Sequence, residues 1–335
     1  MTPFIEPFWL PIIFAGLMGL SILLYVVLDG YDLGVGILTA FEPTADRDLM
    51  VASIGPFWDA NETWLVLAIG LLLVAFPTAH GLILTQLYLP VTLMLLGLVA
   101  RGVAFEFRAK AEPNWKPLWD RVFYGGSLIT ALAQGYMLGA YILGFDQSFG
   151  AVLFCLLAAV GLTAGYIFVG ACWLIYKTEG ALQRRAVTWA RFGLWATALG
   201  MAVVSISTPL MSERIFDRWF HLPEIIALIP IPLFSAVLFV GLAIFLARPM
   251  RHDDALSWVP LATAGTLFAL GFIGIAYSFY PYVVPDKLTI WQAASSPEAL
   301  SIILIGTLFV LPVILGYSIL AHWLFRGKAT ALSYY

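Results

Sequence analysis

Long apolar runs alternate with short polar segments along nearly the whole chain. A helix needs about 20 apolar residues to cross the hydrocarbon core of a bilayer. Apolar segments of that length are placed at 8–29, 54–77, 80–104, 122–144, 149–175, 188–210, 223–247, 257–281 and 299–325. The pattern therefore predicts an all-α polytopic membrane protein with about nine transmembrane helices in a single integral membrane domain, 1–335.

Composition agrees with this class. The chain is 61% hydrophobic with a mean hydropathy of +0.93, and only 11% of its residues are charged. Its start has no basic segment and carries Glu6, which is not typical of a cleavable signal peptide. Cys155 and Cys172 stand about 25 Å apart along one predicted helix, too far for a disulfide, so we interpret them as packing residues. Membrane lipids, and no nucleic acid, are the expected surroundings.

The distribution of basic residues predicts the orientation, because cytoplasmic loops of membrane proteins carry an excess of Lys and Arg. With nine spans, one side of the membrane receives only Arg214, Arg218 and Lys287 of the 17 basic residues. The other side, which also holds the C-terminus, receives all the remaining Lys and Arg residues. We therefore expect a periplasmic N-terminus and a cytoplasmic C-terminus. Four spans on either side of a middle one further suggest two four-helix bundles plus one additional helix, with halves 1–145 and 185–335.

Ionisable residues gather at one end of the first three predicted spans. They are Asp29, Asp32, Asp59, Glu62, Arg101, Glu106, Arg108 and, further on, Asp120, and the second span adds Trp58, Asn61 and Trp64 among them. The clean apolar run of the second span, 64–76, would measure about 20 Å as a helix, whereas the hydrocarbon core is about 30 Å thick. This helix must therefore extend back through Glu62 and Asp59, which share a face because they are three residues apart.

Two interpretations of this cluster remain open. Charges at membrane depth are costly, and those that persist serve ion or proton pathways or pair with one another. Carboxylates in partly buried and partly hydrated surroundings, such as Asp59 and Glu62, can take up and release protons. In the alternative, Arg101 and Arg108 neutralise the acids and the cluster is a static anchor between three helices.

The histidines argue against a haem held by this chain alone. A haem with two axial histidines needs a pair at matched depth on facing helices. His80 and His221 fall at or beyond the outer ends of predicted spans and His252 falls in a cytoplasmic loop, whereas His322 lies inside a span, near its inner end. A haem with a single histidine ligand at His322 stays open from the sequence, and no metal site is expected elsewhere. Redox chemistry, if it occurs, would therefore use cofactors on another chain.

Three motifs together resemble those of one family. The first is Asp29-Gly30-Tyr31-Asp32-Leu33-Gly34-Val35-Gly36, and the second comprises Trp58, Asp59, Asn61 and Trp64. The third comprises Arg101, Phe105, Glu106, Phe107 and Arg108, followed by Trp119 and Asp120. In order and spacing they resemble subunit II of the cytochrome bd-type quinol oxidases, over residues 20–121. The family pattern does not fix an acid at the position of Glu62.

The resemblance implies a function that composition does not. Such a chain would be the non-haem subunit of an electrogenic, non-pumping respiratory enzyme of the bacterial inner membrane, which oxidises quinol and reduces dioxygen to water. The haems, two b-type plus a d- or b-type, would lie on subunit I. Further partners would be quinol, a small single-helix accessory subunit and a structural quinone or lipid. The short chain and its aromatic-rich loops are similar to the cyanide-insensitive branch.

The resemblance also assigns roles to residues. No catalytic residue is expected in this chain. Asp59 would lie on a cytoplasmic proton path, shaped by Trp58 and extended by Glu62. The remaining members of the cluster would give structural or electrostatic support: Asp29, Asp32, Asn61, Trp64, Arg101, Glu106, Arg108 and Asp120.

Two other functions stay in view. Intramembrane carboxylates near an arginine would also suit a proton-coupled secondary transporter. Against it, the halves contain no matched pair of Gly- or Pro-interrupted helices, and the acids sit at one face instead of the midplane. The third function is a purely structural scaffold for the haem subunit, with no part in proton transfer.

Overall fold

The computed structural model describes residues 6–211, 213–222, 224–248 and 255–330, and within them the chain is almost entirely helical. The long helices are α1 (Trp9–Leu38), α3 (Trp58–Ala75), α4 (Pro77–Lys110), α5 (Lys116–Ile142), α6 (Phe149–Lys177), α7 (Gly180–Met211), α10 (Pro230–Ala247), α11 (Val259–Phe279) and α13 (Pro297–Leu324). The short elements are η1 (Thr39–Phe41), α2 (Thr44–Ile54), α8 (Glu213–Phe220), α9 (Glu224–Leu228), β1 (Tyr282–Val284), β2 (Leu288–Thr289) and α12 (Ile290–Ala293).

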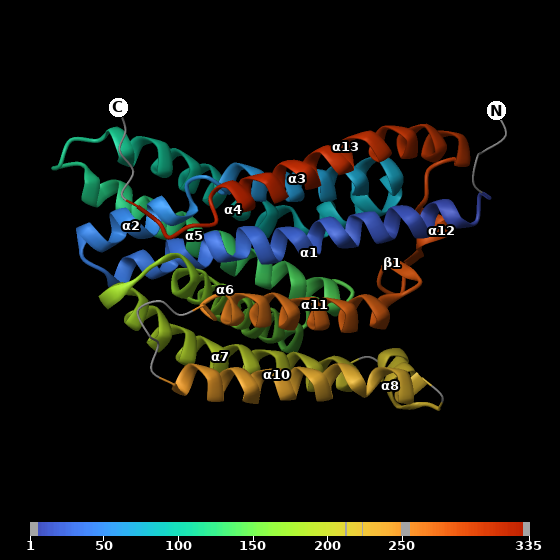
Figure 1. Ribbon diagram of the computed structural model, residues 1–335. Helices are drawn as coiled ribbons and strands as arrows, with labels where there is room; N and C mark the ends of the chain where they lie inside the picture. Colours follow the sequence, from blue (N-terminus) through green and yellow to red (C-terminus); the bar gives the residue numbers. More distant parts are fainter. Residues whose placement is uncertain (1–5, 212, 223, 249–254, 331–335) are drawn as a thin grey trace.

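Eight of the helices in the described residues are long and apolar enough to cross a membrane. They are α1 continued by η1, α3, α4, α6, α7, α10, α11 and α13. The predicted span 122–144 corresponds to α5, which packs between α4 and α6 but is not among the eight. The class of an all-α polytopic membrane protein is therefore confirmed, while the count of nine stays a prediction. The start of α1 and the end of α13 lie at opposite ends of the molecule, as an odd number of crossings requires (Figure 1).

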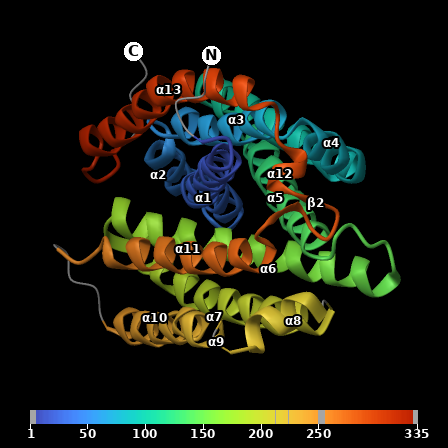
Figure 2. The same cartoon turned by 90° about the vertical axis from the view of Figure 1, so that its right-hand side faces the viewer.

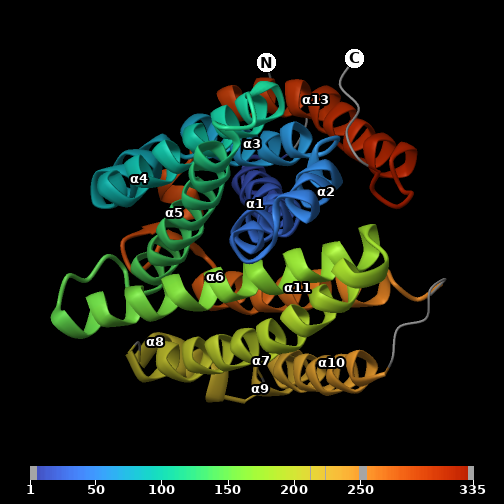
Figure 3. The same ribbon diagram turned by 90° about the vertical axis from the view of Figure 1, so that its left-hand side faces the viewer.

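The helices form stacked groups (Figures 2 and 3). Helix α6, with α11 beside it, separates α1 from α7 and α10. On the other side of α1 lie α3 and α13. Helix α4 packs against α5 at the edge of the molecule. Although α13 belongs to the last part of the sequence, it packs against α3 and α1 from the first part. The two halves of the chain therefore share packing surfaces, with α1 at the centre.

Helix α1 is longer than the sequence pattern predicts. The first span was expected to end at residue 29, but the helix continues to Leu38. Its second half is buried through Gly30, Gly34 and Gly36, although glycine is a poor helix former. The reason is close packing: α1 crosses α6 where glycines of both helices meet, and this tertiary contact outweighs the low propensity. Asp29 and Asp32 are thereby inside a buried helix and not at its end.

Glycine is required where α1 meets α6. A Cβ atom added to Gly170 of α6 would lie 2.6 Å from the Gly34 carbonyl carbon and 2.6 Å from the Val35 nitrogen of α1. Backbone atoms cannot move aside as the end of a side chain can, so neither helix tolerates a methyl group here. This contact fixes the distance between α1 and α6 close to Asp29 and Asp32.

Helix α2 was not predicted, because residues 30–53 were expected only to lie between the first two spans. It runs from Thr44 to Ile54 and places one face of the helix against α1 and α6. Arg185 of α7 holds this region by ion pairs to Glu42 and Asp46, each at 2.6 Å. The buried residues Met50, Val51 and Ile54 give α2 an apolar side that the mixed polar sequence of the segment conceals.

We expect the Gly170→Ala variant to be destabilised by about 3 kcal/mol, at the upper end of the cost of overpacking, because the added methyl group meets backbone atoms of α1. Thermal unfolding in detergent, followed by tryptophan fluorescence, measures the effect. Gly241→Ala in α10 is the matched control, since a Cβ atom there meets nothing within 4 Å. An unfolding temperature of Gly170→Ala equal to that of the control would contradict the interpretation of this contact.

Candidate functional site

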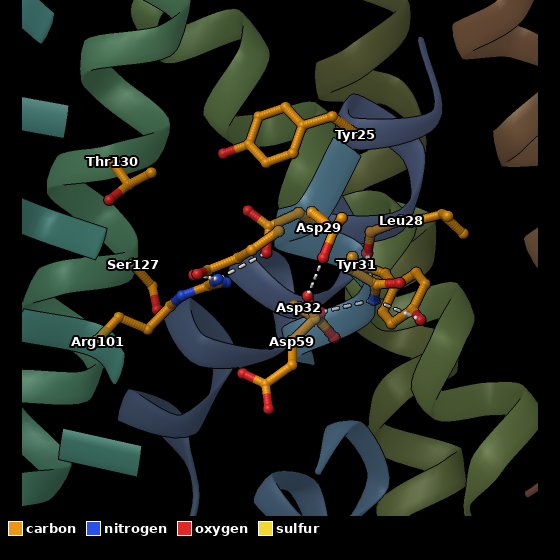
Figure 4. A network of polar contacts seen from close by, with 12 residues as sticks. Tyr25, Leu28, Asp29, Tyr31, Asp32, Asp59, Arg101, Ser127 and Thr130 are labelled. Atoms are coloured by element: carbon orange, nitrogen blue, oxygen red, sulfur yellow. Dashed lines mark hydrogen bonds and ion pairs between the residues drawn. The ribbon is translucent and has the colours of Figure 1, made fainter. Parts of the chain in front are cut away.

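A buried arginine joins three helices at the centre of the site (Figure 4). Arg101 of α4 is 2% exposed and donates to Asp29 Oδ1 of α1 at 2.7 Å. The same nitrogen, Nη2, also forms an ion pair with Glu62 of α3. Glu62 is 30% exposed whereas Asp29 is 1% exposed, so the guanidinium group stands between a half-buried and a fully buried carboxylate.

A second set of contacts starts from Asp32, one turn after Asp29 on α1. Asn61 of α3 is fully buried, and its Nδ2 donates to Asp32 Oδ2 and to Tyr31 Oη, each at 2.8 Å. The Tyr31 hydroxyl lies 3.1 Å from Nε2 of His322 on α13. The ring of Tyr31 stacks on Trp173 of α6, with centroids 4.0 Å apart. Four helices thus contribute to the surroundings of Asp32.

Several buried polar atoms at this site have no hydrogen-bond partner among the residues that the structure describes. They are Asp29 Oδ2, Asp32 Oδ1, Asn61 Oδ1, Trp64 Nε1 and Arg101 Nε. An unpaired buried polar atom costs about 1–3 kcal/mol. A group of such acceptors and donors close together is the setting in which internal water is bound. The site is therefore suited to hold water between its carboxylates.

Above Asp29 lies a buried chain of neutral polar groups. Tyr166 of α6 donates to Gln134 Oε1 of α5 at 2.6 Å, and Gln134 Nε2 donates to Tyr25 Oη of α1 at 2.6 Å. The hydroxyl group of Tyr25, one turn before Asp29, faces the Asp29 carboxylate (Figure 4). These groups extend the polar interior away from Arg101 and toward the opposite end of α1.

Asp59 lies outside this buried network. Its side chain is exposed on the first turn of α3, and none of the described residues forms an ion pair with it. Glu62 and the exposed Glu106 are close enough to repel it electrostatically. Trp58 packs on Phe105 of α4 with ring centroids 5.1 Å apart, which forms a wall beside these acids. The carboxylates therefore pass from exposed Asp59 through half-buried Glu62 to buried Asp29.

The other predicted members of the cluster form a separate network at the end of α4. Arg108 pairs with Asp120 of α5 at 2.5 Å and with Asp48 of α2 at 2.8 Å. Arg47 of α2 also pairs with Asp120, at 3.0 Å. The structure therefore divides the predicted cluster into an acid site around Arg101 and an ionic anchor around Arg108.

Sequence reasoning found part of the site. Asn61 is its central donor, and Trp64 is fully buried beside it. Tyr31, His322 and the chain above Asp29 were not assigned to the site. Tyr31 carried a signal, since it stands between Asp29 and Asp32 in the first motif. His322 had been singled out as a histidine inside a span, but nothing in the sequence indicated its contact with Tyr31, because 291 residues separate the two.

The described residues contain no group of three or more His, Cys, Asp or Glu side chains that could hold a metal ion. The single-histidine haem is disfavoured by the contacts of His322. Its Nδ1 bonds to the Ser318 carbonyl oxygen at 2.8 Å and its Nε2 faces Tyr31, so both ring nitrogens are engaged within the chain. His252 lies outside the described residues.

We expect Arg101→Leu to lose about 3 kcal/mol or more of stability, because it leaves Asp29 as a buried charge without a partner. Adding Asp29→Asn to that variant should recover part of the loss. The unfolding temperature in detergent measures both, and Arg121→Leu on the exposed face of α5 is the control. Equal losses in the single and double variants would show that the Arg101–Asp29 pair is not what stabilises the three helices.

Comparisons with known proteins cover nearly the whole chain. The sequence profile of the family described as cytochrome bd terminal oxidase subunit II matches residues 10–325. The chain is 29% identical over 327 residues to cytochrome bd ubiquinol oxidase subunit 2 of Bacillus subtilis, covering 91% of this chain and 93% of that protein. It is 28% identical over 362 residues to cytochrome bd-I ubiquinol oxidase subunit 2 of Escherichia coli K12, covering 94% and 93%.

A solved structure shares the fold. The bd oxidase from Geobacillus thermodenitrificans contains a chain that superposes with a TM-score of 0.75 at 17% identity, covering 94% of this chain and 98% of that one. The family match extends over α1 to α13 and thus includes every helix that contributes to the acid site. The chain therefore belongs to the cytochrome bd terminal oxidase subunit II family.

Proposed function

We propose that this chain is the non-haem subunit of a membrane quinol oxidase and that it carries cytoplasmic protons toward the oxygen-reducing site of its partner. The partner would be a haem-bearing subunit I that holds two b-type haems and a third of d- or b-type. The complex would oxidise quinol and reduce dioxygen to water in the bacterial inner membrane, without pumping protons. Membership of the subunit II family supports the first part of this proposal.

The proton path rests on one observation: the exposure of the carboxylates falls from Asp59 through Glu62 to Asp29. Asp59 stands on a helix that is long and apolar enough to span the membrane, yet its carboxylate is exposed. Such a group is too costly to leave against lipid, so water or another protein must cover it. A partner subunit on this face of α3 would meet the requirement and would bring the acid close to its own chemistry.

Asp59 and Glu62 can relay a proton because a carboxylate both accepts and releases one. Arg101 stays protonated, so it cannot pass a proton on, but it can hold Glu62 and Asp29 at a fixed separation. Water bound to the unpaired Oδ2 of Asp29 and Nε of Arg101 would complete the connection. Trp58 would shape the entrance through its contact with Phe105.

The direction of uptake follows from the proposed orientation. The ionic anchor around Arg108 and the basic residues Arg47, Lys116 and Arg185 lie at the same end of the molecule as the end of α4. By the positive-inside rule this end faces the cytoplasm. Protons would therefore reach Asp59 from the side that supplies them for water formation.

We expect Asp59→Asn to lower quinol-dependent oxygen uptake about tenfold or more, since the amide cannot carry a proton. The complex is purified in mild detergent through a tag on this chain, and haem content is read from reduced-minus-oxidised spectra. Haem content and co-purification of the partner should match the wild type, because the Asp59 side chain forms no ion pair with the described part of the chain. Glu112→Gln in the exposed segment before α5 is the control.

Two outcomes would contradict the proposal in different ways. Loss of haem together with activity in Asp59→Asn would assign the residue a structural role, and the chain would then be a scaffold for subunit I. Purification of the wild-type chain without a haem-bearing partner or oxygen uptake would contradict the oxidase function itself, and proton-coupled transport would be tested next.

A further inference from the structure

His322 connects the last long helix to the acid site. Among the helices that can span the membrane, α13 has the smallest buried share, and few of its side chains reach the interior. His322, in its last turn, is half-buried and reaches the acid site. Its Nε2 lies 3.1 Å from Tyr31 Oη, and Tyr31 Oη accepts from Asn61 Nδ2 at 2.8 Å. The same nitrogen of Asn61 donates to Asp32 Oδ2 at 2.8 Å.

The contacts of His322 define its hydrogen positions. The Ser318 carbonyl oxygen, 2.8 Å from Nδ1, can only accept, so Nδ1 carries a hydrogen. In the neutral ring Nε2 is then an acceptor, and it receives the hydrogen of the Tyr31 hydroxyl. The Tyr31 oxygen is left to accept from Asn61. In this state the Tyr31 hydroxyl points its hydrogen toward α13 and away from Asp32.

Protonation of His322 reverses the direction of this bond. Both ring nitrogens of a protonated histidine are donors, so Nε2 then donates to Tyr31 Oη. The Tyr31 hydrogen must turn to another acceptor. Asp32 Oδ1 is fully buried and has no partner among the described residues. Because Tyr31 Oη and Asp32 Oδ2 both lie 2.8 Å from one amide nitrogen, a single water can bridge from the Tyr31 hydroxyl to the Asp32 carboxylate.

Of the groups around the His322 ring, Tyr31 is the one whose hydrogen bond can change when the ring is protonated. Among the residues that the structure describes, the titratable or charged groups facing His322 are Tyr31 of α1 and Lys177 of α6. Lys177 donates to the carbonyl oxygens of Phe325 and Gly327, each at 2.5 Å, so its ammonium group is held at the end of α13. The other neighbours of the ring are Phe57 and Trp173, which are aromatic.

We propose that His322 is a positioning residue for the acid site: its protonation state, transmitted through Tyr31, sets the hydrogen bonding of Asp32. The effect of this residue on proton uptake rests on the proposed function, whereas the hydrogen-bonded connection from His322 through Tyr31 to Asp32 does not. A histidine gains a positive charge as the pH falls, so the state of Asp32 should respond to cytoplasmic pH. The cytoplasmic end of α13 would thereby adjust proton delivery inside the helices it covers.

The experiment follows the carboxyl band of Asp32 by infrared spectroscopy as the pH of the purified complex is changed. The band is assigned by its loss in Asp32→Asn. The wild-type band should shift as the pH is lowered and His322 takes up a proton. His322→Gln keeps a polar group near Nε2 without a charge, and Tyr31→Phe keeps the ring on Trp173 without the hydroxyl. In both variants the shift should disappear.

The double variant provides the sharpest test. Because the two residues act in series, His322→Gln with Tyr31→Phe should change the band no more than either single variant does. His221→Gln is the matched control, since His221 is exposed and its ring contacts the backbone of Asp217 one turn earlier. Oxygen uptake measured on the same samples should lose its dependence on pH in the same two variants.

Three results would overturn the proposal. One is a pH-dependent band in His322→Gln identical to that of the wild type, and another is additive effects of the two substitutions. The third is a wild-type band that does not respond to pH. A complex without oxygen uptake whose Asp32 band still behaves as expected would contradict only the proposed function. If His322→Gln fails to assemble, Tyr31→Phe alone decides by the same band.

Discussion

The buried guanidinium group of Arg101 is the interaction on which the arrangement of the first helices depends. It reaches from α4 to Asp29 of α1 and Glu62 of α3, and it neutralises charge where solvent is largely absent. A lone carboxylate at that depth would be strongly destabilising, and so would a lone arginine. The three helices must therefore keep their register with respect to one another. Asn61 and Asp32 then meet one turn further along α1.

Small residues make this ionic contact geometrically possible. A Cβ atom on Gly126 of α5 would lie 2.7 Å from the Gly97 carbonyl oxygen and 2.8 Å from the backbone nitrogen of Arg101. Helix α4 therefore approaches α5 directly beside the arginine. The corresponding contact of Gly34 with Gly170 brings α1 onto α6. With the backbones this close, the arginine extends across the interior toward α1 and α3. Close packing at glycines and burial of charge are thus two parts of one structural solution.

The site is closed on one side and open on the other. Around Asp29 and Asp32 the side chains of α1, α3, α5 and α6 exclude solvent, whereas Asp59 and Glu106 remain on the surface. A purely static anchor would not require exposed acids beside the buried ones. The separate network of Arg108, Asp120 and Asp48 already anchors the ends of α2, α4 and α5. The Arg108 network is therefore the ionic anchor, and the site around Arg101 is the candidate functional site.

The sequence by itself determined the membrane class and most helix positions, because runs of about 20 apolar residues have few alternatives in a bilayer. It also located Asp29, Asn61, Glu62 and Arg101, because charged and amide groups stand out in an apolar chain. It did not place the end of α1 or the helix α2, since both depend on packing against α6, which local patterns do not report. Only the tertiary structure decided which acids are buried and which are exposed. It alone brought His322 to Tyr31, because a contact across 291 residues arises from the way the helices stack and leaves no periodic trace in the chain.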